Sequence, residues 1–484
     1  MSPAPDSLAS SRGQAGGAAW GWRTMLAMAA AIVVTRLPLL GGGYGSDDDT
    51  WRNIVAALHT RAVGRYIPSR IPGFPVYDGL LAVLAPGGWL VTNLASVLAE
   101  VAAALLFARL LQRLQVRNAL PAWLALAFSA PLWVEASQTI DYAFGLALFL
   151  AAFLALMDRR YARAAILLAL AVGTRLSYVW VNVGVAAMLW TRRESLRSIG
   201  TYAAVHAAAV IVIFLPFILS PEARDLSHHF TKHAAHHATL RTLLPILRVM
   251  GIFLFGKWGV LLLAAAAFTW LFDSVRRARR ARTPSRGVAR SDPSPGLGER
   301  GPAPPSARSL EGRAAAMFAA GSAIGVGGFF LLIPYEGAYI LALLPIAIIA
   351  ADRWLPRRWF MALAATMILQ VFVSVSAQER RLVPGALFEE RTQRRHDVAD
   401  TREMMAVNPP HPTIYVVGNF MLHRLLVLDP GLERLDAAWE PFYATGVGLR
   451  SRSRAVMFAQ VMVPAEREEW ERQGWTVEDR PYPD

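Results

Sequence analysis

Long apolar runs separated by arginine-rich loops limit what this chain can fold into. A full bilayer crossing needs about 20 predominantly apolar residues, with a range of about 17–25. Only 17% of the 484 residues are charged, whereas a typical soluble domain carries roughly 25%. The sequence therefore predicts a mainly α, polytopic membrane protein of about 11 transmembrane helices. The predicted segments are 24–40, 88–112, 119–135, 139–157, 162–173, 176–190, 199–219, 246–272, 314–333, 337–351 and 357–375.

The arginines orient these segments. In a soluble protein a net charge of +14 would indicate nucleic-acid binding, but most of the excess here lies in short loops between apolar runs. Cytoplasmic loops carry such an excess by the positive-inside rule. We therefore expect a multi-pass protein of the inner (plasma) membrane, with these loops in the cytoplasm and no nucleic-acid partner. The orienting residues are Arg113, Arg117, Arg159, Arg160, Arg163, Arg192, Arg193, Arg197, Arg353, Arg357, Arg358 and the stretch 276–313.

Composition divides the chain further. Residues 1–23 are predicted to be a disordered cytoplasmic N-terminus, and 281–312, rich in Pro, Gly, Ser and Arg, a disordered basic cytoplasmic linker. An N-terminal membrane module, 24–280, precedes the linker, and C-terminal membrane helices, 313–375, follow it. Residues 376–484 contain the strand-like runs TIYVVG, RLLVL and AVMFAQVMV between helical stretches. They predict a small C-terminal α/β domain, which an odd number of crossings places outside the cytoplasm.

Three adjacent carboxylates, Asp47, Asp48 and Asp49, follow the first apolar segment, and a short amphipathic segment comes next. One interpretation is a helix cap, because acids favour helix N-termini. One cap needs only one Asp, however. We therefore favour a functional role for the triplet at the lipid–water boundary.

Further polar residues gather on the predicted outer face. Arg175 lies in the turn GTRLSY between the two short segments 162–173 and 176–190. Broken segments at membrane depth are tolerated where they line a protein-enclosed or watery cavity. Most of these residues lie at helix ends, so their convergence on one face is the argument for function. They are Arg70, Glu135, Asp141, Arg175, Glu336 and Tyr339.

Structural interpretations stay open for several of them. Arg175 can instead be an arginine that snorkels to the lipid headgroups, and Glu135 and Asp141 can be helix-end polar groups. Arg36, near the end of the first segment, is predicted to be an interfacial anchor. The loop histidines His229, His233 and His237 have helical spacing, which fits either a divalent-metal site or one face of an amphipathic interfacial helix. The chain has no cysteine, so it has neither a disulfide nor a thiolate metal site.

The order of five motifs resembles a known family. An Arg ends the first segment in VVTRLPLL, acids open a helix in SDDDTWRNIVAAL, and a Tyr–Pro–Gly stretch follows in RYIPSRIPGFP. The turn AVGTRLSY and the late segment IPYEGAYILALLPIAII complete the series. Over about residues 24–375 the chain resembles the GT-C superfamily of polyprenyl-phosphate-sugar-dependent glycosyltransferases, including the protein O-mannosyltransferase and aminoarabinose transferase branches. It departs from the family pattern in having Asp-Asp for Asp-Glu and Arg175 for Lys.

The resemblance implies a GT-C-like fold and a hexosyl- or pentosyltransferase. The donor would be a polyprenyl-phosphate-linked sugar and the acceptor the hydroxyl of a lipid, glycan or protein, at a site facing outside the cytoplasm. Asp48 matches the first acid of the family's pair and is the predicted general base, flanked by Asp47 and Asp49. Arg175 and Arg70 are predicted to bind the phosphate. Tyr66, Asp141, Glu135, Glu336 and Tyr339 are predicted to contact substrate.

A transporter or flippase of a lipid-linked sugar is the alternative function. Such a protein needs the same arginines for the phosphate but needs no general base. No cofactor is required by either function, and the histidine loop leaves a divalent metal open.

The orientation can be tested by single-cysteine labelling, because the chain has no native cysteine. Ser285 lies in the predicted cytoplasmic linker. A Ser285→Cys variant should therefore stay unlabelled by an impermeant maleimide in intact cells and be labelled after permeabilisation. Labelling in intact cells would reverse the predicted orientation.

Overall fold

The structure is a computed structural model that describes most of the membrane part of the chain. Between residues 20 and 406 it covers 20–70, 72–221, 223, 240–282, 307–332, 337–376 and 381–406. Beyond them it describes 413–417, 419–428, 433–434, 449–450, 454–457, 467–468, 471–474 and 476–480. The predicted N-terminal tail up to residue 19 and linker residues 283–306 lie outside the described residues.

The N-terminal part begins with an apolar helix and a polar loop. Helix α1 (Trp22–Arg36) continues into the 3-10 turn η1 (Leu37–Leu39). After the loop, α2 (Asp48–Val63) is the predicted amphipathic helix. Helix α3 (Pro75–Leu84), which the sequence analysis did not predict, is joined through η2 (Ala85–Gly87) to α4 (Gly88–Arg113).

The other helices of the bundle follow in chain order. They are α5 (Ala119–Ala127), α6 (Ala130–Ala136), α7 (Tyr142–Met157), α8 (Tyr161–Thr174), η3 (Leu176–Val181), α9 (Asn182–Thr191), α10 (Leu196–Ile218), α12 (Leu240–Arg282), α13 (Ala307–Leu332), η5 (Gly337–Ile340), α14 (Leu343–Trp354) and α15 (Arg357–Leu369).

Five of the described helical stretches are long and apolar enough to cross a membrane, and the bent pair α5–α6 would make a sixth. The predicted number of about eleven is therefore not confirmed. The difference lies in short apolar helices such as α7, α8 and η3–α9, which have the right composition but not the length. The predicted break at Arg175 is confirmed, because Arg175 has an extended backbone between α8 and η3.

Helices from both sides of the linker share one core. The backbones of α9 and α13 approach so closely that a Cβ on Gly184 would lie 2.4 Å from the Phe318 carbonyl oxygen. Near this contact Phe318 stacks on Phe153 of α7 with ring centroids 4.0 Å apart. Small residues of this kind allow helices to pack closely in membranes, where the hydrophobic effect contributes little.

A buried ion pair joins α1 to α4. Arg36 Nε donates to Glu100 Oε2 at 3.0 Å, its Nη2 contacts Glu100 and the Ala127 carbonyl, and both charged side chains are fully buried. The guanidinium also lies over Trp133, 4.2 Å from the ring centroid. The prediction that Arg36 is an interfacial anchor is wrong, because Glu100, which the sequence analysis did not single out, draws it into the protein.

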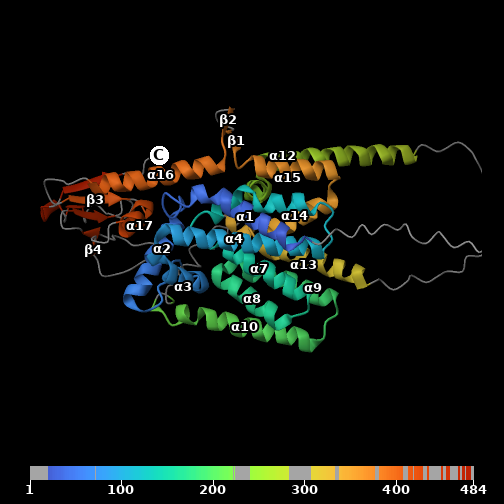
Figure 1. Cartoon of the computed structure of the whole chain (residues 1–484), viewed down its shortest axis with the longest axis horizontal. Coiled ribbons are helices and arrows are strands. Elements are labelled where there is room, and N and C mark those ends of the chain that lie inside the picture. Colours follow the sequence, from blue (N-terminus) through green and yellow to red (C-terminus); the bar gives the residue numbers. More distant parts are fainter. Residues whose placement is uncertain are drawn as a thin grey trace, which may run out of the picture.

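Figure 1 shows the C-terminal part leaving the bundle along helix α16 (Ala386–Ala406). Strands β1 (Val373–Ser376) and β2 (Arg381–Pro384) pair antiparallel before it. Five further short strands form a sheet of order β4-β5-β6-β3-β7, in which β3 pairs parallel with β6 and β7. Their bounds are β3 (Thr413–Val417), β4 (Glu433–Arg434), β5 (Leu449–Arg450), β6 (Arg454–Met457) and β7 (Thr476–Arg480).

The strand prediction for RLLVL is wrong, because these residues lie in helix α17 (Asn419–Leu428). A short apolar run does not distinguish a strand from a buried helical segment. Here the helix buries Leu425 and pairs Arg424 with Asp397 of α16 at 2.7 Å. Helix α17 packs against α2, and Val427 and Leu428 join a cluster around Trp51. The C-terminal part is thereby attached to α2, the helix that begins within the acidic triplet.

Breaking the Arg36–Glu100 pair should destabilise the protein. Glu100→Ala leaves a guanidinium buried without its carboxylate, and removal of one partner of a buried pair typically costs about 3–5 kcal/mol. We expect a clear fall in the apparent Tm of the detergent-purified protein. Arg36→Met combined with Glu100→Leu should recover most of the loss, because no charge is then left buried. An unchanged apparent Tm for Glu100→Ala would contradict the assigned pair.

Candidate functional site

The acidic triplet opens helix α2. Asp47 is the N-cap, and its side chain accepts a hydrogen bond from the Asp49 amide at 2.8 Å. The helix begins at Asp48, whose side chain lies outside the described part. The capping interpretation is therefore correct for Asp47. It does not apply to Asp49, whose side chain makes different contacts.

Asp49 binds two arginines. Its Oδ1 forms an ion pair with Arg52, one turn along α2, and its Oδ2 with Arg70 from the loop between α2 and α3. All three side chains are largely buried, at 9–15% exposed. Charge-assisted contacts of this kind are roughly twice as strong as neutral hydrogen bonds. Asp49 thus fixes Arg70 beside the start of α2.

The series of charges continues to the broken helix pair. Arg70 Nη2 lies 3.6 Å from Asp141 Oδ1, and Arg175 Nη1 donates to both Asp141 oxygens at 3.0 and 3.2 Å. Asp141 is fully buried and Arg175 is 2% exposed. An arginine that snorkels to the headgroups would not be buried against a carboxylate, so that interpretation of Arg175 does not fit. We call Arg52, Asp49, Arg70, Asp141 and Arg175 the charge cluster.

Aromatic rings cover the guanidinium groups of Arg70 and Arg175. Arg70 lies over Phe74 at 4.4 Å from the centroid, and Arg175 lies between Tyr142 at 4.2 Å and Tyr339 at 4.9 Å. Ring faces attract cations and exclude water. Buried guanidinium groups held and oriented in this way are suited to contact an anionic group such as a phosphate.

The loop that carries Arg70 is shaped by Asp78. This buried carboxylate accepts from the Tyr66 hydroxyl at 2.7 Å, the Ser69 hydroxyl at 2.7 Å and the Phe74 amide at 3.1 Å. Gly73 has φ +85°, and a Cβ there would lie 2.4 Å from the Tyr66 hydroxyl. Tyr66 therefore helps to hold the conformation of the Arg70 loop.

Glu135, Glu336 and the loop histidines are the other predicted site residues. Glu135 of α6 accepts from the Gln138 side chain at 3.3 Å. Glu336, His229, His233 and His237 lie outside the described residues. Among the residues that are described, no group of three or more His, Asp or Glu side chains could hold a metal ion.

The loop between η1 and α2 is held by several elements. Asn93 of α4 donates to the carbonyls of Leu40 and Gly43 at 3.2 and 3.0 Å, and the Thr139 amide donates to the Tyr44 carbonyl at 2.8 Å. Tyr44 packs edge-on against Trp51 at 5.1 Å, and its burial raises the pKa of the Tyr44 phenol. The loop therefore has a fixed path up to the acidic triplet.

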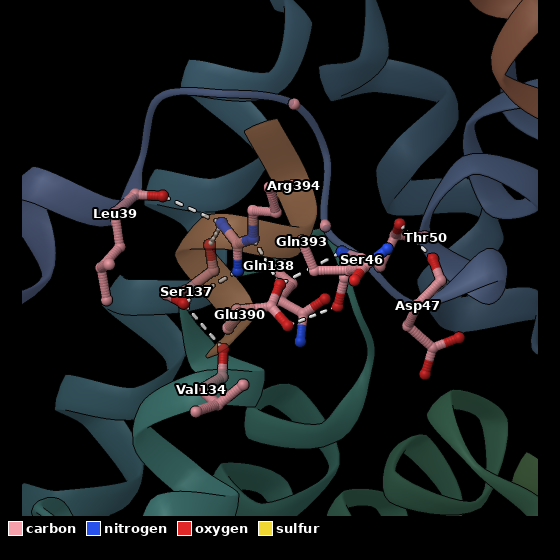
Figure 2. Close-up of polar contacts among 12 residues, drawn as sticks. Leu39, Ser46, Asp47, Thr50, Val134, Ser137, Gln138, Glu390, Gln393 and Arg394 are labelled. Carbon is pink, nitrogen blue, oxygen red and sulfur yellow. Dashed lines mark hydrogen bonds and ion pairs between the residues drawn. The ribbon is translucent and has the colours of Figure 1, made fainter. Parts of the chain in front are cut away.

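Helix α16 clamps both ends of this loop (Figure 2). At one end, Arg394 donates to the Leu39 carbonyl at 2.9 Å and to the Ser137 carbonyl at 3.0 Å. At the other end, Glu390 accepts from the Ser46 amide at 3.1 Å and from the Ser46 hydroxyl. Glu390 and Arg394 also pair with each other. We call Glu390 and Arg394 the α16 clamp. Through Glu390 the clamp holds Ser46, the residue that directly precedes Asp47.

Sequence reasoning missed four residues that build this region. Arg52 lies at i+3 from Asp49, so helical spacing could have found it. Asp78, Glu390 and Arg394 carried no usable signal. Glu390 is 344 residues from Ser46 in the chain, and only the fold brings them together.

Comparisons with known proteins bear on the fold. Neither a protein-family model nor a curated protein matches the sequence. Among solved structures, the chain is similar to the crystal structure of ArnT from Cupriavidus metallidurans bound to undecaprenyl phosphate, with a TM-score of 0.50 and 15% identity. The match covers 83% of this chain and 84% of that one. It supports the predicted GT-C-like membrane fold, and at this identity it shows the fold alone.

Loss of the α16 clamp should release the loop ahead of the acidic triplet. Glu390→Ala removes the acceptor of the Ser46 amide, and a hydrogen bond to a charged group typically contributes about 1.5–3 kcal/mol. Amide hydrogen exchange in a peptide that covers Ser46 should therefore speed up by about ten- to a hundredfold. Glu389→Ala, which changes an exposed neighbour on the same helix, is the matched control and should leave the exchange unchanged. Equal protection in Glu390→Ala and Glu389→Ala would contradict the clamp.

Proposed function

We propose that this protein transfers a sugar from a polyprenyl-phosphate donor to an acceptor hydroxyl. The charge cluster is the observation that carries the proposal. In this cluster the guanidinium groups of Arg70 and Arg175 both lie beside the buried carboxylate of Asp141, at the end of apolar helices. The likeness to ArnT, which was crystallised with undecaprenyl phosphate, supports the same substrate class.

The proposed reaction is a single displacement at the anomeric carbon. The acceptor oxygen forms a bond to that carbon, and the bond from the carbon to the phosphate oxygen breaks. The acceptor proton passes to a carboxylate, for which Asp48 is the proposed base. The electron pair leaves with the polyprenyl phosphate, and Arg175 and Arg70 stabilise the developing charge. Guanidinium groups match phosphate oxygens in a bidentate geometry.

The neighbouring acids have different proposed roles. Asp47 is engaged at the helix N-terminus, and Asp49 holds Arg52 and Arg70. Asp48 is the proposed proton acceptor because it matches the first acid of the GT-C pair in the resemblance described above. Asp141 is proposed to orient Arg175, and Tyr66 and Asp78 to shape the Arg70 loop. The predictions that Glu135, Glu336 and Tyr339 contact substrate are retained, with Tyr339 the best supported because it lies over Arg175.

A transporter or flippase of a lipid-linked sugar would use the same arginines to bind the phosphate but would not catalyse sugar transfer. The assay that separates the two uses the purified protein and a panel of radiolabelled polyprenyl-phosphate sugars, with candidate acceptors supplied in detergent. Sugar transfer to an acceptor supports the enzyme. Donor binding and translocation without transfer supports the transporter. A chelator added to the same assay tests whether a divalent metal takes part.

Asp48→Asn should abolish transfer while leaving donor binding intact. General-base catalysis typically contributes about 10²–10⁴ in rate, and Asn preserves the size of the side chain. Turnover and donor affinity should be measured for Asp47→Asn, Asp48→Asn and Asp49→Asn in parallel. Wild-type turnover in Asp48→Asn would exclude Asp48 as the base, and loss of turnover with unchanged donor affinity in only one of the other two variants would move the role to that residue.

Arg175→Ala should weaken donor binding or turnover by about ten- to a hundredfold. Loss of a charge-assisted hydrogen bond typically costs about 1.5–3 kcal/mol. Arg175→Lys keeps the charge and should be partly tolerated. The apparent Tm of each variant serves as the folding control, since Arg175 also binds buried Asp141. Identical donor titrations for folded wild type and Arg175→Ala would remove Arg175 from the phosphate site.

A further inference from the structure

A second basic site lies beside the clamped loop. A cavity of about 280 Å³ opens between the loop that leaves η1 and the side of helix α16. It is lined by Pro38, Leu39, Gly41, Gly42, Arg391, Arg394 and Arg395. No member of the charge cluster lines this cavity.

One wall of the cavity is rigid. Arg394 is 3% exposed and is committed to the Leu39 carbonyl, the Ser137 carbonyl and hydroxyl, and Glu390. The charge of Arg394 is therefore balanced by Glu390. Arg394 therefore forms part of the cavity wall, and any uncompensated positive charge in the cavity comes from its neighbours on α16.

Arg391 and Arg395 supply that charge. They lie one turn apart on α16, are exposed, and form no ion pair with another residue in the described part of the chain. Like charges at i and i+4 destabilise a helix by a few tenths of a kcal/mol. An anion between the two guanidinium groups would remove this repulsion, and phosphate matches their geometry.

The opposite wall leaves room for such a group. Gly41 and Gly42 present only backbone, and a Cβ on either would meet nothing within 4 Å. The volume falls just below the roughly 300–1,000 Å³ of pockets that enclose drug-sized ligands. The cavity is therefore suited to a headgroup rather than to a whole glycolipid.

The position of the cavity points to a lipid. Pro38 and Leu39 are the last residues of the first membrane-spanning stretch, Trp22–Leu39. Lipid headgroups lie at the ends of such stretches, and a guanidinium group forms charge-assisted hydrogen bonds with the phosphate of a headgroup. We propose that the cavity binds the phosphate of an anionic phospholipid headgroup through Arg391 and Arg395, at a site separate from the charge cluster. A headgroup bound there would rest against Arg394, which forms the α16 clamp with Glu390.

Native mass spectrometry of the full-length, detergent-purified protein tests this site. The protein is titrated with dihexanoyl phosphatidic acid, dihexanoyl phosphatidylcholine and inorganic phosphate. Wild type should bind phosphatidic acid at least tenfold more tightly than the other two. Arg391→Gln combined with Arg395→Gln should lose that preference. Arg402→Gln changes an exposed arginine of α16 that does not line the cavity, and should bind like wild type.

Several results would overturn the lipid site formed by Arg391 and Arg395. Unchanged phosphatidic acid binding by the folded double variant would overturn the site. Equal affinity for inorganic phosphate would identify a free-phosphate site and overturn the lipid assignment. Asp48→Asn should bind phosphatidic acid like wild type, because the proposal does not depend on sugar transfer. Arg175→Ala should also do so if it folds, and loss of binding in that variant would assign the lipid to the charge cluster instead.

Discussion

The fully buried carboxylate of Asp141 is the interaction on which the candidate site depends. It comes from the residue before α7 and holds Arg175 from the broken pair α8–η3, with Arg70 3.6 Å away. Removing one partner of a buried ion pair leaves an uncompensated charge, which typically costs about 3–5 kcal/mol. Three segments of the chain, which carry Arg70, Asp141 and Arg175, therefore meet at this carboxylate.

The C-terminal part contributes to this arrangement from a distance. The α16 clamp fixes the loop that leads to Asp47, and α17 packs against α2. The acidic triplet is consequently held between a membrane helix on one side and the C-terminal helices on the other. A site built on an isolated loop would leave a general base poorly placed, whereas a loop held at both ends is preorganised. The same helix carries the arginines of the proposed lipid site, so one element supports both surfaces.

Much of the fold, but less of the site, could be read from the sequence. The apolar runs gave α1, α4 and α10 because length and composition mark them directly, and Arg175 between two short apolar runs marked the break. The count of about eleven crossings is not confirmed, because α7 and α8 are apolar yet short. The roles of Arg36 and the α16 clamp could not be predicted, because each depends on a partner brought close only by the fold. Arg36 needs Glu100, 64 residues away, and Ser46 needs Glu390.

The most direct test of the account is the position of the donor phosphate. A cryo-electron microscopy structure of the protein with bound undecaprenyl phosphate should place phosphate oxygens within hydrogen-bond reach, about 2.7–3.2 Å, of the guanidinium groups of Arg70 and Arg175. The lipid chain should then run along the apolar helices. A phosphate bound elsewhere, with none of its oxygens within hydrogen-bond reach of Arg70 or Arg175, would contradict the assignment of the charge cluster as the donor site.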